Sequence, residues 1–134
     1  MTDRVRDAMV SEPPQLDGGA SAQEAGEALG RPEVRALFVC EEGRLLGVVT
    51  RKTLVREVVA AGLDPRTTEL RGIAEQPHNT IGSDVPLDEA FQFLEVHDLE
   101  RVPVVEHGRL VGVLSRAVLQ RRLAEDEPPA DLED

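Results

Sequence analysis

The sequence repeats itself at an offset of 65 residues. Residues 39–56 align without a gap with residues 104–121, and ten of these eighteen positions are identical. The same offset places the helical pattern around Leu29 opposite that around Leu94. A match of this length between two parts of one chain indicates two copies of a single structural unit.

Each copy is predicted to fold as strand–helix–strand–turn–strand–helix. Short apolar runs rich in β-branched residues predict the strands. Gly43 and Gly108 stand third in four-residue turns between the last two strands, where a positive φ is useful. Thr50 and Ser115 occupy helix N-cap positions, with apolar residues at helical spacing behind them. The predicted strands are 15–16, 36–40 and 45–49 in the first copy and 80–81, 102–105 and 110–114 in the second.

The boundary between the two copies is set by residues that end a helix. Gly62 ends the last helix of the first copy, and Pro65 prevents its resumption. We therefore assign residues 1–62 to the first copy and 63–124 to the second, and we expect the acidic segment 125–134 to be disordered. The predicted core consists of Leu29, Leu37, Val39, Leu46, Val48, Leu94, Val102, Val104, Val111 and Val113.

Charge and composition exclude several functions. Twenty-six acidic and fifteen basic residues give a net charge of −11, which argues against a partner as acidic as duplex nucleic acid. Three Phe and no Trp or Tyr leave no platform for stacking single-stranded bases. No apolar run reaches the length of a membrane span or a signal peptide, so we expect a cytoplasmic protein without a membrane partner.

Neither metal binding nor catalysis is expected. His78, His97, His107 and the single Cys40 are spaced unlike any common set of metal ligands. The sequence contains no nucleophile elbow, phosphate-binding loop or carboxylate pair within a predicted pocket. We therefore interpret the protein as a non-enzyme, with Cys40 as a small apolar group at the end of a buried strand.

Residues 45–50 and 110–115 resemble the signature of the cystathionine-β-synthase (CBS) domain family. That signature is an apolar–Gly–apolar strand followed by Ser or Thr at the start of a helix, with Asp three residues later. The Val102–Pro103 pair also suits the family. The tandem arrangement resembles a Bateman module, and residues 55–65 resemble the inter-repeat helix of free-standing bacterial CBS pairs of the actinobacterial hypoxic-response type.

The resemblance implies an α/β (α+β) fold of two βαββα CBS repeats about a pseudo-twofold axis. It also implies inter-repeat clefts for adenosine-containing ligands such as AMP, ATP or S-adenosylmethionine. Backbone groups at the strand would read adenine, and a helix N-terminus would face ribose or phosphate. The positions implied for ligand binding are Leu37, Phe38, Thr50, Lys52, Thr53, Thr80, Ile81, Arg101, Val102, Pro103, Ser115, Arg116 and Val118.

This sequence departs from the family signature at the Asp position. Thr53 and Val118 stand there, and neither supplies the carboxylate that would accept hydrogen bonds from a ribose diol. The loss of a charge-assisted hydrogen bond of roughly 1.5–3 kcal/mol weakens ribose binding. The basic residues beside the caps, such as Arg51, Lys52 and Arg116, are either phosphate contacts or solvated helix faces.

Two functions remain open at the sequence level. One is a non-catalytic sensor that binds an adenosine-type ligand and signals to an unidentified protein partner. The other is a ligand-independent dimerisation or interaction scaffold that has lost nucleotide binding. In both cases we expect a homodimer with an isologous interface, because the helices carry more apolar residues than one chain can bury.

Overall fold

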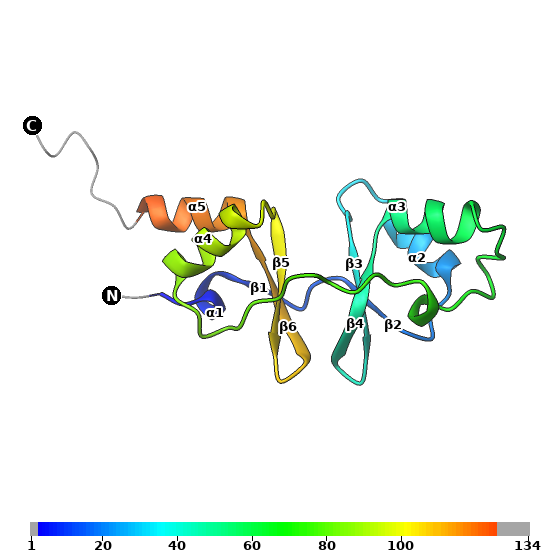
Figure 1. Cartoon of the computed structure of the whole chain (residues 1–134), viewed down its shortest axis with the longest axis horizontal. Helices are drawn as coiled ribbons and strands as arrows, with labels where there is room; N and C mark the ends of the chain where they lie inside the picture. The colour runs from blue at the N-terminus through cyan, green and yellow to red at the C-terminus, as the bar shows by residue number, and fades with distance from the viewer. Residues whose placement is uncertain (1–2, 126–134) are drawn as a thin grey trace, which may run out of the picture. The chain divides into compact units, whose positions relative to one another are not determined.

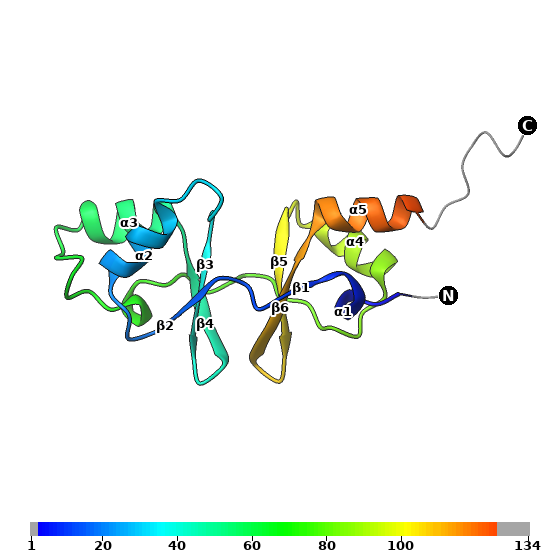
Figure 2. The same ribbon diagram turned by 180° about the vertical axis from the view of Figure 1, so that it is seen from behind.

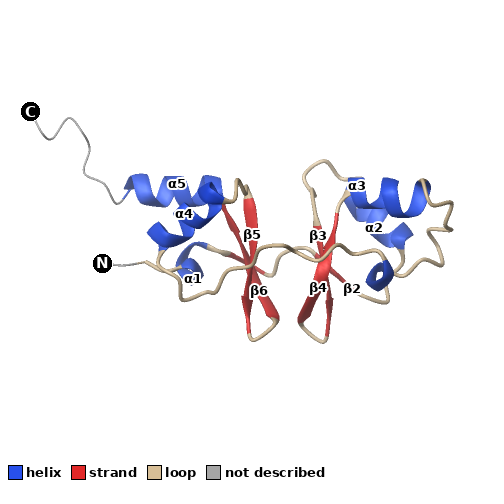
Figure 3. Ribbon diagram, in the orientation of Figure 1, coloured by secondary structure: helices blue, strands red, loops and turns tan. Residues whose placement is uncertain are grey.

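The computed structural model describes residues 3–125, and these fold into two compact units (Figure 1). Unit 1 contains residues 3–11, 79–106 and 111–125. Unit 2 contains residues 12–78 and 107–110. Each unit combines helices with strands, which confirms the predicted α/β class with two repeats (Figure 3).

Unit 2 is built on three strands that follow one another along the chain in the predicted order. Strand β2 (Gln15–Asp17) runs parallel to β3 (Leu37–Glu41), and β3 pairs antiparallel with β4 (Arg44–Val49). The helical elements of the unit are α2 (Ala22–Leu29), α3 (Arg51–Leu54), the π-helical η1 (Val55–Val59) and the 3₁₀ turn η2 (Leu70–Gly72). Helices α2 and α3 lie on the same side of β3 and β4 in Figure 1 and in the reverse view of Figure 2.

Side chains from all of these layers form the core of unit 2. The fully buried residues include Leu29 of α2, Val39 of β3, Val49 of β4 and Leu70 of η2. Ser21 caps α2, because its hydroxyl accepts a hydrogen bond from the Glu24 amide at 3.1 Å. The fold of unit 2 therefore depends on apolar residues that recur at strand and helix spacing.

Unit 1 repeats this plan with a second set of elements. They are α1 (Val5–Ala8), β1 (Val10–Ser11), α4 (Leu87–Val96), β5 (Arg101–Glu106), β6 (Arg109–Ser115) and α5 (Arg116–Glu125). β5 pairs with β6, β1 adds to β6 in antiparallel pairing, and Ile81 forms a parallel bridge to Val104. The core contains Val5, Leu94, Val102 and Leu114, all fully buried.

The compact units cross the boundaries expected for the two sequence copies. Val5, from the start of the first copy, packs in the core of unit 1, whereas its counterpart Leu70 packs in the core of unit 2. Residues 63–78 thus fold with the first copy and residues 3–11 with the second. The ranges 1–62 and 63–124 describe the two copies in the sequence, whereas the compact units have the bounds given above. Of the segment 125–134, residues 126–134 lie outside the described residues.

The glycine turns adopt the predicted geometry. Gly43 and Gly108 have φ of +84° and +80°, and the residues before them, Glu42 and His107, also have positive φ. Two successive positive φ values define a type I′ turn, whose twist matches that of the flanking strands. Two hydrogen bonds of 3.0 Å, Leu45 N–H to Gly108 and Leu110 N–H to Gly43, join the two turns in unit 2.

Four of the predicted core residues prove to be only partly buried or exposed. Leu46 is 37% exposed, and Val48, Val111 and Val113 are half-buried. Both faces of these strands are apolar, so alternation alone did not identify the inner face. The residues that face the core are Val49 and Leu114, together with Gly47 and Gly112.

The glycines mark the side on which another segment approaches. A Cβ on Gly47 would lie 2.7 Å from the Glu75 carbonyl oxygen, and one on Gly112 would lie 2.8 Å from that of Val10. Both distances are shorter than real contacts allow, so only glycine fits. Because neighbouring segments approach Gly47 and Gly112 so closely, the face of each strand that carries the glycine is the buried face.

Candidate functional site

Two threonines, Thr50 and Thr53, cap the start of helix α3 in unit 2. The amide of Thr53 donates to the Thr50 hydroxyl at 3.3 Å, and the amide of Thr50 donates back to the Thr53 hydroxyl at 3.0 Å. The two hydroxyl oxygens are 3.1 Å apart. This reciprocal pattern is a capping box, which confirms the predicted N-cap.

Thr53 stands where the family signature has Asp, and it is fully buried at 0% exposure. Its hydroxyl group is occupied by Thr50, both as acceptor for the amide and as partner of the hydroxyl. In this arrangement the Thr53 side chain completes the helix start and offers no polar atom to solvent. The position therefore has a structural role in unit 2.

The other implied positions of unit 2 lie on either side of this cap. Leu37 and Phe38 are buried on β3, and the Phe38 amide donates to the Pro14 carbonyl at 3.1 Å. Lys52 is exposed. Arg51, its neighbour, donates to the carbonyl oxygens of residues 31 and 34 at 2.9 Å each, which ties the helix start to the preceding loop.

The helix start in unit 1 carries the same cap in a looser form. The Val118 amide lies 3.5 Å from the Ser115 hydroxyl, at the outer limit of a hydrogen bond. Val118 is half-buried and has no polar side-chain atom. Arg116 is engaged with acidic residues, since its guanidinium lies 3.5 Å from Glu100 and 3.9 Å from Asp98.

The strand positions implied for adenine contact are brought together in unit 1. The Ile81 amide donates to the Pro103 carbonyl at 3.1 Å, and the Val105 amide donates to the Ile81 carbonyl at 2.9 Å. Val102 and Pro103 are buried, while Thr80 and Arg101 are exposed. The thirteen implied positions thus divide into five in unit 2, residues 37–53, and eight in unit 1, residues 80–118.

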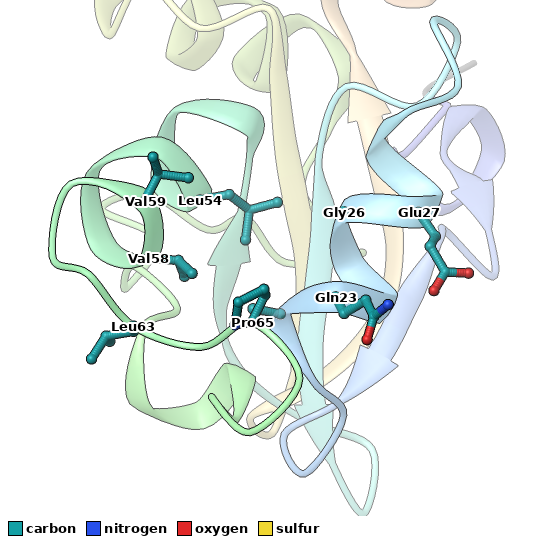
Figure 4. A pocket seen from close by; sticks show the side chains of 9 residues that line it. Gln23, Gly26, Glu27, Leu54, Val58, Val59, Leu63 and Pro65 are labelled. Carbon is teal, nitrogen blue, oxygen red and sulfur yellow. The ribbon is translucent and has the colours of Figure 1, made fainter.

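Sequence reasoning missed an apolar groove in unit 2. It lies between α2 and the α3–η1 helix and has a volume of about 400 Å³. Figure 4 shows Leu54 and Pro65 between the two helices and Gly26 on α2 without a side chain. The residues that line the groove are Ala22, Gln23, Gly26, Glu27, Leu54, Val58, Val59, Leu63 and Pro65.

The groove is surrounded by apolar side chains that remain in contact with solvent. Val55, Val59 and Leu63 are 57%, 72% and 47% exposed. Val55 and Val59 lie in the π-helical turn η1, in which the Ala60 amide donates a hydrogen bond of 2.8 Å to the Val55 carbonyl. Only one apolar side chain of this helix is buried, that of Val58; Leu54 is half-buried, and Val55 and Val59 are exposed.

Cys40 and the histidines form no common site. Cys40 is buried on β3, and desolvation raises the pKa of its thiol. Within residues 3–125, no three His, Cys, Asp or Glu side chains lie close enough to hold a metal ion together. In the same part of the chain, no helix combines the length and apolar character needed to cross a membrane.

Comparison with known proteins agrees with the repeat. The CBS domain family model matches residues 5–60 and 70–125. Hypoxic response protein 1 of Mycobacterium tuberculosis is 31% identical over 102 residues, which cover 75% of this chain and 71% of that protein. The CBS domain-containing protein YhcV of Bacillus subtilis is 27% identical over 114 residues, covering 83% of this chain and 79% of its own.

Solved structures show the same fold. The crystal structure of Hypoxic Response Protein I with two coordinated zinc ions has a TM-score of 0.75 at 28% identity, covering 89% of this chain and 98% of that one. A hexameric CBS-CP12 protein from bloom-forming cyanobacteria has a TM-score of 0.68 at 21% identity, covering 100% of this chain and 76% of its own. CBS-pair proteins are generally regulatory modules rather than enzymes. With two copies of the unit in sequence and in structure, this chain belongs to the CBS domain family.

Proposed function

We propose that this protein is a non-catalytic regulatory module that acts through protein association and does not bind an adenosine-type ligand through its ribose. The proposal rests on the side chains at the two positions where the family signature has Asp. Thr53 is buried and occupied by its own capping box, and Val118 has no polar side-chain atom. Neither helix start supplies a carboxylate to accept hydrogen bonds from a ribose diol.

The size of this loss supports the proposal. A carboxylate that accepts hydrogen bonds contributes about 1.5–3 kcal/mol for each charge-assisted bond. The loss of one such bond corresponds to a tenfold to hundredfold weaker association. A ligand that another CBS pair holds with a dissociation constant of about 10 μM would then bind this chain with one of roughly 0.1–1 mM.

The basic side chains near the caps support the same conclusion. Arg51 is bound to two backbone carbonyls, and Arg116 lies beside Glu100 and Asp98. Recruitment of either guanidinium to a phosphate would break these contacts. The net charge of −11 adds a general repulsion of anionic ligands.

The second candidate is the adenosine sensor, in which the module signals to a protein partner after AMP, ATP or S-adenosylmethionine binds. It is favoured by the hydroxyls retained at Thr50 and Ser115 and by the exposed basic side chains of Lys52 and Arg101. In either case we propose a homodimer, since Val55, Val59 and Leu63 expose apolar surface that a second copy would cover.

Calorimetric titration tests the proposal. Wild-type protein is titrated with adenosine, AMP, ATP and S-adenosylmethionine, and we expect no saturable binding below about 0.1 mM. The matched variant Val118→Asp adds the missing carboxylate beside Ser115, and we expect it to gain adenosine binding. Wild-type binding of any of these ligands at micromolar concentration would contradict the proposal and select the sensor.

A further inference from the structure

Two arginines lie opposite each other where the glycine turns of unit 2 meet. Arg44 and Arg109 are partners in antiparallel register. The hydrogen bonds that join the two turns are made by the residues on either side of this pair. The arginines are therefore a non-hydrogen-bonded pair, in which opposite Cα atoms are only about 4.5 Å apart and the side chains are closest. Like charges placed directly opposite each other destabilise such a pair.

Within residues 3–125, neither guanidinium forms an ion pair with an acidic side chain. Arg109 donates to the Glu42 carbonyl oxygen at 2.9 Å, and Arg44 donates to the His107 carbonyl oxygen at 3.4 Å. A guanidinium carries five N–H donors. Most of the donors of these two exposed side chains are therefore available for another acceptor.

The acidic residues of the same two hairpins do not neutralise the pair. Glu41 binds Arg71, whose Nε lies 2.7 Å from the carboxylate, and Glu106 accepts a hydrogen bond from the Ser83 hydroxyl. Glu42 forms no ion pair with any described residue. Two positive charges thus remain together in a chain of net charge −11. At physiological ionic strength, charges more than about 8 Å away are largely screened, so the pair determines the local potential.

Backbone donors without a partner lie beside both guanidiniums. A Cβ on Gly43 would collide with the guanidinium of Arg109, and one on Gly108 would collide with that of Arg44. Each arginine therefore lies directly over the opposite glycine. In the part of the chain that the structure describes, the amides of both glycines donate no hydrogen bond. Free amides in a turn and guanidinium groups are both typical donors to phosphate oxygens.

We propose that Arg44 and Arg109 together bind one phosphate-type dianion at these turns, either inorganic phosphate or a phosphomonoester. The charge of such a group at pH 7, about −1.5 to −2, balances the two guanidiniums. The planar fork of arginine matches the oxygens of phosphate. The turns lie at the opposite ends of β4 and β6 from the helix starts at Thr50 and Ser115 (Figure 1), so the inference goes beyond the proposed function.

An NMR titration locates the site. Wild-type protein labelled with ¹⁵N is titrated with sodium phosphate, while sodium chloride is reduced so that the ionic strength stays constant. We expect the amide signals of Gly43 and Gly108 to shift together and to saturate with one dissociation constant of roughly 1 mM. If these two signals did not approach saturation by about 10 mM phosphate, the proposal would be overturned.

Substitution of each arginine tests whether both bind the same anion. Arg44→Gln and Arg109→Gln should each weaken phosphate binding about tenfold or more, because each removes charge-assisted hydrogen bonds. Arg35→Gln is the matched control and should bind as the wild type does, since Arg35 is also exposed and forms no ion pair within the described residues. Phosphate binding by either variant of the pair as tight as that of the control would show that the two arginines do not share a site.

Thermal unfolding provides a second measurement on the same proteins. Phosphate at ten times its dissociation constant should raise the melting temperature of the wild type and of Arg35→Gln by roughly 4–7 °C. For Arg109→Gln we expect a rise of less than about 2 °C. The dispersion of the NMR signals verifies that each variant is folded, and the wild-type titration decides the proposal even where a variant fails to fold.

These outcomes are distinguishable from those of the proposed function, because adenosine carries no phosphate. Saturable adenosine binding below about 0.1 mM contradicts the proposed function and leaves the phosphate site intact. Absence of phosphate binding at the turns overturns the site and leaves the proposed function intact.

Discussion

The substitution Thr53→Val tests whether this buried hydroxyl stabilises the helix start. Valine has nearly the shape of threonine, so the change removes the hydroxyl and leaves the packing. In the wild type this hydroxyl accepts the Thr50 amide at 3.0 Å and lies 3.1 Å from the Thr50 hydroxyl. The variant leaves the Thr50 amide without this acceptor at a half-buried position.

The magnitude follows from these two contacts. Loss of an N-terminal capping group reduces the free energy of unfolding by about 0.5–2 kcal/mol, and a buried donor without a partner loses about 1–3 kcal/mol. Water can partly reach Thr50, so we expect a loss of about 1–2 kcal/mol. For a chain of 134 residues this corresponds to a fall in melting temperature of roughly 3–8 °C.

Thermal and urea unfolding followed by circular dichroism measure this effect. The control is Thr67→Val, where the exposed hydroxyl makes only a 3.4 Å contact with the Asp64 carbonyl, and we expect a change within about 0.5 kcal/mol. If Thr53→Val matched the wild type in melting temperature, the capping role would be wrong.

Three further predictions use the glycines and the cysteine. Gly47→Ala should lower the free energy of unfolding by about 1–3 kcal/mol, because its Cβ would lie 2.7 Å from the Glu75 carbonyl oxygen. The control Gly82→Ala, with open space around it, should change the free energy of unfolding little, and urea unfolding compares the two variants. Gly43→Ala should lose about 1–2 kcal/mol from its positive φ, and an unchanged urea midpoint would contradict the turn geometry. Cys40 should react with a thiol reagent at neutral pH at least about tenfold more slowly in the folded than in the urea-unfolded protein, because burial raises its pKa and limits access; equal rates would contradict its burial.

Much of the local structure could be predicted from sequence because short-range physics determines it. The glycine turns require positive φ, and Gly43 and Gly108 supply it. Thr50 and Ser115 can cap helices wherever an apolar helical pattern follows, and both do so here. The repeat identified the family and, with it, the positions at which Thr53 and Val118 replace a carboxylate.

The candidate site was only partly predictable. The implied positions were located from the family signature, but their hydrogen-bond partners depend on neighbours that no local pattern names. Thr53 proved to be buried in a capping box, and Arg116 proved to lie beside Asp98 and Glu100. The apolar groove beside Gly26 could have been found by comparing the two copies position by position, because the residue equivalent to Gly26 in the second copy is Phe91.

By itself, the sequence determined the repeat, the turns, the caps and most of the helices and strands. Strand β1 (Val10–Ser11) was not predicted, and the predicted strand 80–81 is present only as a bridge at Ile81. Only the tertiary structure decided which face of β4 and β6 is buried, because both faces are apolar and the choice depends on the segments that approach Gly47 and Gly112. It also decided that Val5 and Leu70 fill cores outside the copies to which they belong in sequence. Local propensity acts between neighbours along the chain, whereas core packing joins residues that only folding brings together.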